Sequence, residues 1–250
     1  MFQESTMNRI SAPILILAAS LISGCAAKYV TPGGAANLSD IDRADIKELA
    51  ARKPSPSFPA RIASVRVQAP SYRSHTTDGI GVGSYSVITV RELLTEEHLQ
   101  SVSSWPSVAG LAPINRLLLP AKLESLEDLR LAAAKVQADV LLVYTLDTSF
   151  RVQGKFYSPL SIVSLGLVPD REARVVATAS ALFVDVRTGF VYGLAESTAK
   201  EAQLTNAWSS TSTVDAQRLK AEKQAFGQLV QALGEVWQGV VARYDSETET

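Results

Sequence analysis

The stretch 125–150, SLEDLRLAAAKVQADVLLVYTLDTSF, decides the fold, because a helix and a buried strand follow each other in it without a break. Ser125 is suited to cap the N-terminus of a helix, and Asp128, three residues later, can complete a capping box with it. Residues 140–144 are apolar on both faces, as in a strand covered on both sides. From Leu146 onward apolar and polar residues alternate. The pattern predicts a strand that leaves the core partway along its length.

The segments before this unit carry shorter signals of the same kinds. Alternation of apolar residues predicts a strand at 61–68, and β-branched and aromatic residues predict another at 83–90. Residues 92–103 are predicted as a helix, and 114–120 as a third strand closed by proline. Helices are therefore interspersed among the first strands.

The segments after it are longer. Residues 174–199 predict a hairpin with its turn at Thr188-Gly189, since glycine allows a positive φ. Residues 215–244 have apolar positions at helical spacing and predict a long amphipathic helix. This order predicts an α+β fold: a mixed β-sheet with helices packed against it and a long C-terminal amphipathic helix.

The first 25 residues have the features of a secretory signal peptide. Arg9 supplies a positive charge, and residues 10–22 form an uncharged apolar run. This run is shorter than the roughly 20 residues that a membrane-spanning helix needs. Small residues follow it, as expected before a cleavage site.

Ile22-Ser23-Gly24-Cys25, at the end of this run, resembles the lipobox of bacterial lipoproteins and contains the single cysteine of the chain. The resemblance implies cleavage between Gly24 and Cys25 and attachment of diacylglycerol to the Cys25 sulfur. Such lipid holds a protein at a membrane. Residue 26 is Ala and not the Asp that commonly retains such lipoproteins at the inner membrane. The expected location is the periplasmic face of the outer membrane of a Gram-negative cell.

The expected domain organisation follows from these segments. Residues 1–24 are the lipoprotein signal peptide, and residues 25–60, rich in proline and glycine, form a lipidated tether. Residues 61–244 form one α+β domain, and residues 245–250 form an acidic tail. The net charge of −1 includes no basic surplus, so we expect no nucleic-acid partner.

Two segments of the domain resemble a group of bacterial envelope lipoproteins. They are ADVLLVYT at 138–145 and VDVRTGFVYG at 184–193, followed by the closing helix. The group includes the curli-secretion lipoprotein CsgG, the lipoprotein activators of penicillin-binding proteins and the N-terminal domain of TolB. The resemblance covers about residues 61–244. It implies a protein that binds other envelope proteins as a scaffold, assembly or export accessory, without chemistry of its own.

Motifs for catalysis are missing. The two histidines, His75 and His98, do not have the spacing of metal ligands, and there is no G-x-S-x-G sequence. GIGVG at 79–83 lacks the third glycine of a phosphate-binding loop and is interpreted as a turn. We therefore expect no catalytic residues, metal or cofactor. The alternative is a lipid-anchored periplasmic hydrolase whose site has no recognisable motif.

The segment 153–173, QGKFYSPLSIVSLGLVPDREA, is long for a connection inside a compact domain. One interpretation is an extended hairpin that folds over the domain's own core. The other is an exposed apolar patch that contacts the membrane or a protein partner, or forms a homo-oligomer. The candidate contact residues are Phe156, Tyr157, Leu160, Ile162, Val163, Leu165 and Leu167.

Overall fold

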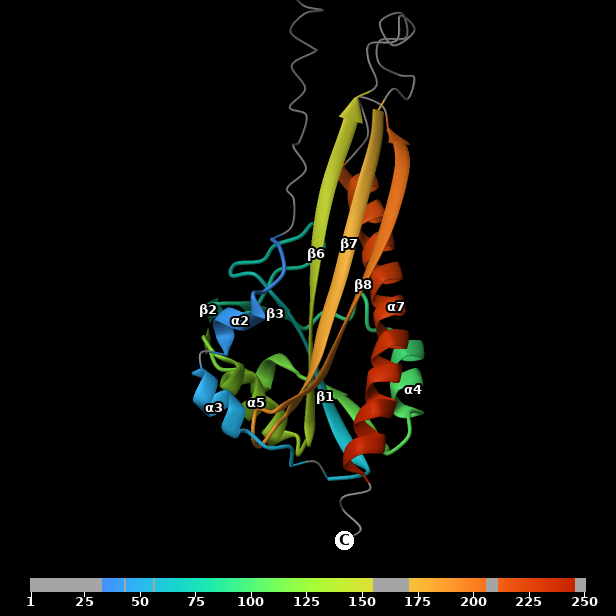
Figure 1. Cartoon of the computed structure of the whole chain (residues 1–250). Helices are drawn as coiled ribbons and strands as arrows, with labels where there is room; N and C mark the ends of the chain where they lie inside the picture. The colour runs from blue at the N-terminus through green and yellow to red at the C-terminus, as the bar shows by residue number, and fades with distance from the viewer. Residues whose placement is uncertain (1–32, 43, 56, 155–170, 206–210, 246–250) are drawn as a thin grey trace, which may run out of the picture.

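The computed structural model describes residues 33–42, 44–55, 57–154, 171–205 and 211–245 (Figure 1). The strands are β1 Ala60–Gln68, β2 Val82–Gly83, β3 Ser86–Ile88, β4 Val108–Pro113, β5 Lys122–Leu123, β6 Val140–Gly154, β7 Arg171–Asp185 and β8 Val191–Thr205. The helices are α2 Leu38–Ile41, α3 Ile46–Ala51, α4 Glu96–Ser103, α5 Leu126–Lys135 and α7 Thr211–Tyr244, with a 3-10 turn at Arg116–Leu118. The α+β class is confirmed.

The main sheet has the strand order β3-β1-β6-β7-β8, with β4 beside the first part of β1. Strand β1 is parallel to β4 and β6, whereas β7 is antiparallel to both β6 and β8. The last three strands have 15 residues each, but β1 pairs only with residues 140–143 of β6. They therefore extend beyond β1 as a three-stranded ribbon, as Figure 1 shows. The strand from 140 thus leaves the core as its sequence pattern predicted.

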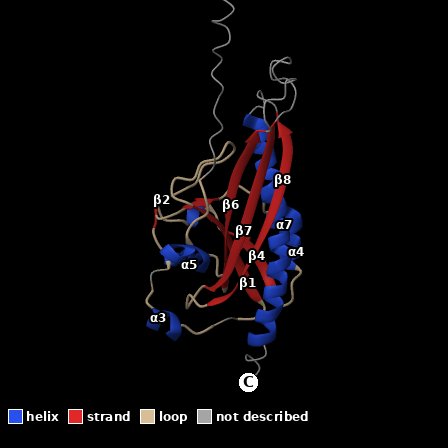
Figure 2. Cartoon of the chain, turned by 45° about the horizontal axis from the view of Figure 1, so that its top comes forward, coloured by secondary structure: helices blue, strands red, loops and turns tan. Residues whose placement is uncertain are grey.

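Helix α5 covers one face of the sheet. Its first turn has the expected capping box, in which Asp128 accepts hydrogen bonds from the backbone N–H groups of Glu124 and Ser125, both at 2.9 Å. Leu129 is fully buried and packs in one cluster with Leu141 of β6. Figure 2 shows α5 on one side of the strands and α7 on the other.

Helix α7 covers the opposite face, above β7 and β8. Small side chains on these strands let the helix approach closely; the buried ones are Ala177, Ala179, Ala181, Ala195 and Ala199. Trp237 of α7 is fully buried, and its indole N–H donates to the Pro106 carbonyl at 2.8 Å. Helix α4 lies beside α7, where the His98 ring meets Phe226 edge-on at 5.2 Å.

The strand predicted at 114–120 is wrong. The strand in this region, β4, ends at Pro113, and the residues after it form the 3-10 turn, in which the Asn115 side chain accepts from the Leu117 N–H. Leu117 is 90% exposed, so its apolar character does not reflect burial. Three consecutive leucines resemble a buried strand, but the partner β1 pairs with the residues before them.

The segment before β1 contacts the domain along its described part. Gly34 accepts from the Gln68 side chain at 3.1 Å, and the Ala36 N–H donates to Thr145 at 3.0 Å. Further along, the Ser55 N–H donates to buried Asp185 at 2.7 Å. The division into a tether and a domain at residue 60 stays a prediction. No helix among the described residues has both the length and the apolar character to cross a membrane.

Candidate functional site

The site residues expected from the sequence lie outside the described residues. These are Gly24 and Cys25 at the expected cleavage and lipidation site, and Phe156, Tyr157, Leu160, Ile162, Val163, Leu165 and Leu167 of the long connection. Their structure is therefore not described, but the points at which the chain enters and leaves them are.

The long connection starts and ends at the far end of the ribbon. Gly154 pairs with Arg171, and Arg171 pairs with Thr205 of β8, so all three lie side by side. The β7–β8 turn, at residues 186–190, lies at the opposite end of the same strands. Residues 155–170 are thus attached about 15 residues of strand away from that turn.

The first described residues lie beside the middle of β6. Ala35 forms an antiparallel bridge with Gln68, and Gln68 in turn donates to the Leu146 carbonyl at 2.9 Å. The adjacent Gly34 lies next to Asp147. The chain therefore meets the domain partway between the two ends of the ribbon.

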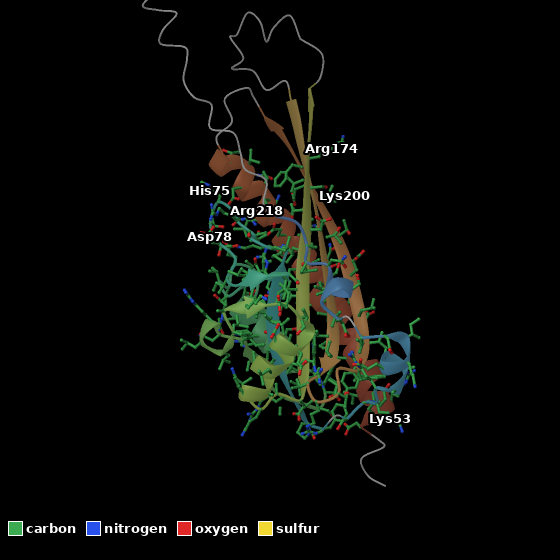
Figure 3. All side chains as sticks on the ribbon, turned by 90° about the vertical axis from the view of Figure 1, so that its left-hand side faces the viewer. Lys53, His75, Asp78, Arg174, Lys200 and Arg218 are labelled. Carbon is green, nitrogen blue, oxygen red and sulfur yellow. The ribbon has the colours of Figure 1, made fainter. Side chains whose placement is uncertain are left out.

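A buried charge cluster fixes α7 to the sheet at the base of the ribbon. We define it as Arg66 of β1 with Asp215, Arg218 and Glu222 of α7. Arg218 is fully buried; its Nε donates to Asp215 at 2.8 Å and its Nη1 to Glu222 at 2.6 Å. Thr148 of β6 also donates to Glu222, at 2.9 Å. Arg218 also donates to the Thr76 hydroxyl, at 3.3 Å, in the loop after β1, of which Figure 3 labels His75 and Asp78.

Arg66 is held more loosely than Arg218. Its Nη2 donates to the Tyr72 hydroxyl at 3.3 Å and lies 3.8 Å from Glu222, while its Nη1 lies 3.9 Å from Glu92. Its Nε has no hydrogen-bond partner in the described structure although the residue is only 2% exposed. The guanidinium also lies over the Tyr72 ring, 5.6 Å from its centroid.

This cluster is suited to positioning and not to proton transfer. Burial alone would lower the pKa of Arg218, but hydrogen bonds to Asp215 and Glu222 outweigh it and raise that pKa. The nearby Tyr144 is also buried, which raises its pKa to about 12. Neither group exchanges protons near neutral pH, where an acid–base catalyst has to. The sequence signal for the cluster is an arginine with acidic residues at helical spacing on the apolar face of α7.

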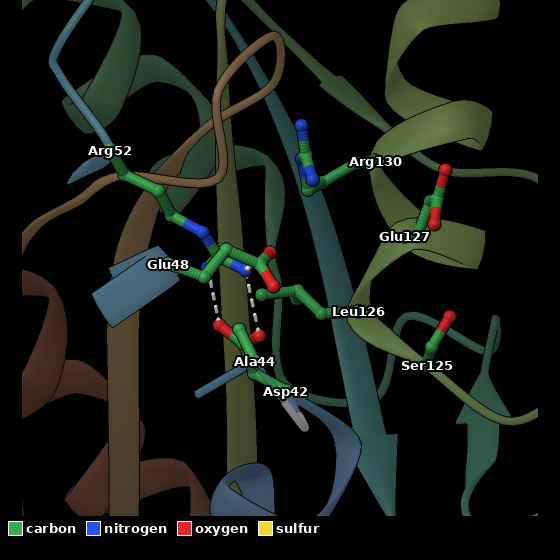
Figure 4. A pocket seen from close by; sticks show the side chains of 8 residues that line it. All are labelled: Asp42, Ala44, Glu48, Arg52, Ser125, Leu126, Glu127 and Arg130. Carbon is green, nitrogen blue, oxygen red and sulfur yellow. Dashed lines mark hydrogen bonds and ion pairs between the residues drawn. The ribbon is translucent and has the colours of Figure 1, made fainter. Parts of the chain in front are cut away.

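We call the segment before β1, from residue 33 to residue 59, the leader. A polar cleft lies between the leader helices α2 and α3 and the start of α5 (Figure 4). Its volume is about 290 Å³. It is lined by Asp42, Ala44, Glu48, Arg52, Ser125, Leu126, Glu127 and Arg130. No sequence pattern predicts this cleft, because its two walls lie about 80 positions apart in the chain.

The arginines of this cleft are used to hold the β7–β8 turn. Arg52 donates twice to Asp42, at 2.6 and 3.0 Å, and also to the Gly189 carbonyl at 3.2 Å. Arg130 donates to the Val186 carbonyl at 3.0 Å and to the Arg187 carbonyl at 2.6 Å. The hydrogen bond from Arg52 lowers the pKa of Asp42, which therefore stays ionised and does not act as an acid. The cleft therefore lies where the leader and α5 contact the β7–β8 turn.

Asp185 is the centre of the same contact. It is fully buried, and its Oδ1 accepts from the Arg187 and Thr188 N–H groups at 2.8 and 2.9 Å. Its Oδ2 accepts from the Ser55 N–H at 2.7 Å and from the Tyr192 hydroxyl at 2.6 Å. Burial and the Asp185 carboxylate raise the pKa of Tyr192. One carboxylate thus ties the turn, β8 and the leader together.

The other residues considered for chemistry have structural surroundings. His98 closes a capping box with Thr95 at the start of α4, and His75 is exposed. No group of three or more His, Cys, Asp or Glu within the described ranges is arranged to hold a metal ion. In GIGVG, Gly83 has a positive φ and approaches the Leu123 backbone so closely that a side chain would clash with it. Gly83 thereby allows the pairing of β2 with β5.

Comparison with known proteins adds little to this picture. No family model matches the chain. No curated protein matches it significantly.

Several solved structures match the chain weakly. A Xanthomonas campestris protein described as belonging to DUF330 is 15% identical and covers 78% of this chain and 95% of its own, with a TM-score of 0.34. Lipoprotein GNA1162 of Neisseria meningitidis is 14% identical, with 72% and 99% coverage and a TM-score of 0.27. The PelC dodecamer of Paraburkholderia phytofirmans is 9% identical, with 71% and 91% coverage and a TM-score of 0.25. At these TM-scores we infer neither family nor function from them, and the resemblance to the CsgG group stays a prediction.

Proposed function

We propose that the chain is a lipid-anchored protein of the cell envelope that acts by binding and has no chemistry of its own. The observation that carries the proposal is Ile22-Ser23-Gly24-Cys25 at the end of an uncharged apolar run. The proposed location is the periplasmic face of the outer membrane, because Ala and not Asp follows the cysteine. The proposed partners are the membrane, through the lipid, and an envelope protein.

The geometry of the ribbon supports a contact between its far end and the membrane. Seven residues lie between Cys25 and Gly33, and the eight steps from one to the other, at up to about 3.5 Å each, reach about 28 Å. From Asp147, beside which the described chain begins, β6 continues for seven residues to Gly154, or about 23 Å. The lipid can therefore lie level with the end of the ribbon. We propose that the apolar residues between 156 and 167 contact the membrane there.

Replacement of Cys25 by alanine tests the anchor. In a Gram-negative host we expect Cys25→Ala to abolish incorporation of labelled palmitate and to move the protein from the membrane to the soluble periplasmic fraction. The matched variant Ala26→Asp keeps the lipid and is expected to shift the protein to the inner membrane. An unlabelled wild type, or a Cys25→Ala variant that is still labelled, contradicts the proposal.

Charge substitutions test the membrane contact separately from the anchor. In the Cys25→Ala background, Ile162→Asp with Leu165→Asp is expected to reduce flotation with anionic lipid vesicles at least several-fold. The melting temperature is expected to remain within about 2 °C of the parent, since exposed substitutions have small effects. The control Val82→Asp, at a residue that is 76% exposed elsewhere on the domain, is expected to leave flotation unchanged. A variant that unfolds instead shows that the segment is part of the core.

A further inference from the structure

Strand β8 is an unusually long free edge. It pairs with β7 along its whole length, and no strand in the described part of the chain pairs with its other side. Natural proteins protect such edges with proline, short strands, bulges, charged side chains or a covering helix. Residues 191–205 contain no proline, and the one register shift lies at the start of the strand, beside Val191. The rest of the edge is regular, and no strand in the described part of the chain occupies it.

We propose that β8 pairs antiparallel with β8 of a second copy of this chain, about a two-fold axis at Thr198. Thr198 is the midpoint of Val191–Thr205, so this register pairs the strand along its whole length. The two ribbons then form one continuous six-stranded sheet. A two-fold interface uses the same surface on both copies, so it requires a strand that complements itself.

The charges of β8 provide that complementarity. Leu194, Glu196, Thr198 and Lys200 are exposed on the ribbon face that points away from α7, the face on which Figure 3 labels Lys200. With the axis at Thr198, Glu196 of each copy lies opposite Lys200 of the other. Opposite charges directly across from each other stabilise an antiparallel pair. Leu194, 70% exposed, lies opposite Ala202 of the second copy.

The same charges disfavour other registers. An axis at Glu196 or at Lys200 places identical charges opposite each other, which destabilises the pair. An axis at 197 places Lys200 opposite Leu194 and gives no ion pair. The axis at Thr198 is therefore the register that pairs both charges and also uses the whole strand.

The side chains at this surface are held in place within one copy. Ser180 of β7 donates to Glu196 at 2.8 Å, and the Thr178 and Thr198 hydroxyls hydrogen-bond at 2.9 Å. On the other face of β8 the buried residues are Ala195 and Ala199, which pack beneath α7. Small residues there leave the helix of each copy close above its own strand.

Cysteine crosslinking tests the register in the full chain carrying Cys25→Ala, so that the introduced thiol is the only one. Thr198→Cys is expected to form a disulfide-linked dimer on mild oxidation, because residues on the axis face each other. Thr178→Cys, which breaks the same hydroxyl pair from the β7 side, is the control and is expected to form no disulfide-linked dimer, because residue 178 is one strand further from the axis. Equal crosslinking of the two variants, or none from a folded Thr198→Cys, overturns the proposal.

Charge reversal tests the interface by sedimentation of the same full chain. Glu196→Lys and Lys200→Glu are each expected to weaken dimerisation about ten-fold, since every reversal replaces two attractive pairs by repulsive ones. The double variant restores opposite charges and is expected to dimerise like the parent. A monomeric parent, a dimer that is indifferent to both reversals, or a double variant that is not restored overturns the proposal. If β8 instead pairs with a strand of another protein, the purified parent chain is expected to be monomeric in this experiment.

Discussion

Replacing Arg218 by methionine is expected to lower the free energy of unfolding by about 3–5 kcal/mol. Arg218 is fully buried, and the substitution leaves Asp215 and Glu222 buried without the cation that pairs with both. The longer ion pair of Arg66 with Glu222, at 3.8 Å, remains but does not replace the 2.6 Å contact of Arg218. A typical domain has only about 5–15 kcal/mol of stability, so the loss is a large fraction. Urea unfolding followed by circular dichroism measures it.

Two further variants show whether the charge itself is responsible. Lys220→Met, on the same helix as Arg218, removes an ion pair with Glu201 of β8, but the Lys220 side chain is 64% exposed, and a surface pair contributes about 0–1 kcal/mol. Arg218→Met combined with Glu222→Gln removes one of the two carboxylates that Arg218 neutralises, so the double substitution is expected to cost less than the sum of its single effects. A cost of Arg218→Met no larger than that of Lys220→Met would show that water reaches the cluster.

Replacing Asp185 by alanine is expected to cost about 3 kcal/mol or more, because it leaves buried donors without an acceptor. Three backbone N–H groups and the Tyr192 hydroxyl donate to this carboxylate. The Ser55 N–H is the donor that comes from the leader. We therefore also expect residues 52–60 to become sensitive to trypsin, with cleavage after Arg52, under conditions in which the rest of the domain is resistant.

Conservative variants separate the contribution of Asp185 to stability from its contact with the leader. Asp185→Asn keeps one acceptor oxygen and is expected to lie between the parent and Asp185→Ala in stability. Tyr192→Phe removes one donor and leaves the leader contact, so it is expected to change stability by about 1 kcal/mol without exposing Arg52. Equal trypsin sensitivity in Tyr192→Phe and Asp185→Ala would contradict a specific connection to the leader.

Much of the fold was predictable because its signals are local. The capping residues Ser125 and Asp128, the apolar run 140–144 and the Thr188-Gly189 turn are short patterns whose meaning depends on neighbouring residues. The strand at 114–120 was wrongly predicted because an apolar run alone does not show whether another strand pairs with it. Pairing of β1 with 108–113 decided which residues became strand.

The sequence by itself determined the type and order of the main elements and the motif at Cys25, since periodicity and short motifs are properties of adjacent residues. Only the tertiary structure decided that Arg66 and Arg218, about 150 positions apart, share one buried cluster. It also decided that Asp185 holds the leader and that β8 is the edge of the sheet. Burial and edge position are properties of the assembled sheet, because they depend on which distant segment covers a residue.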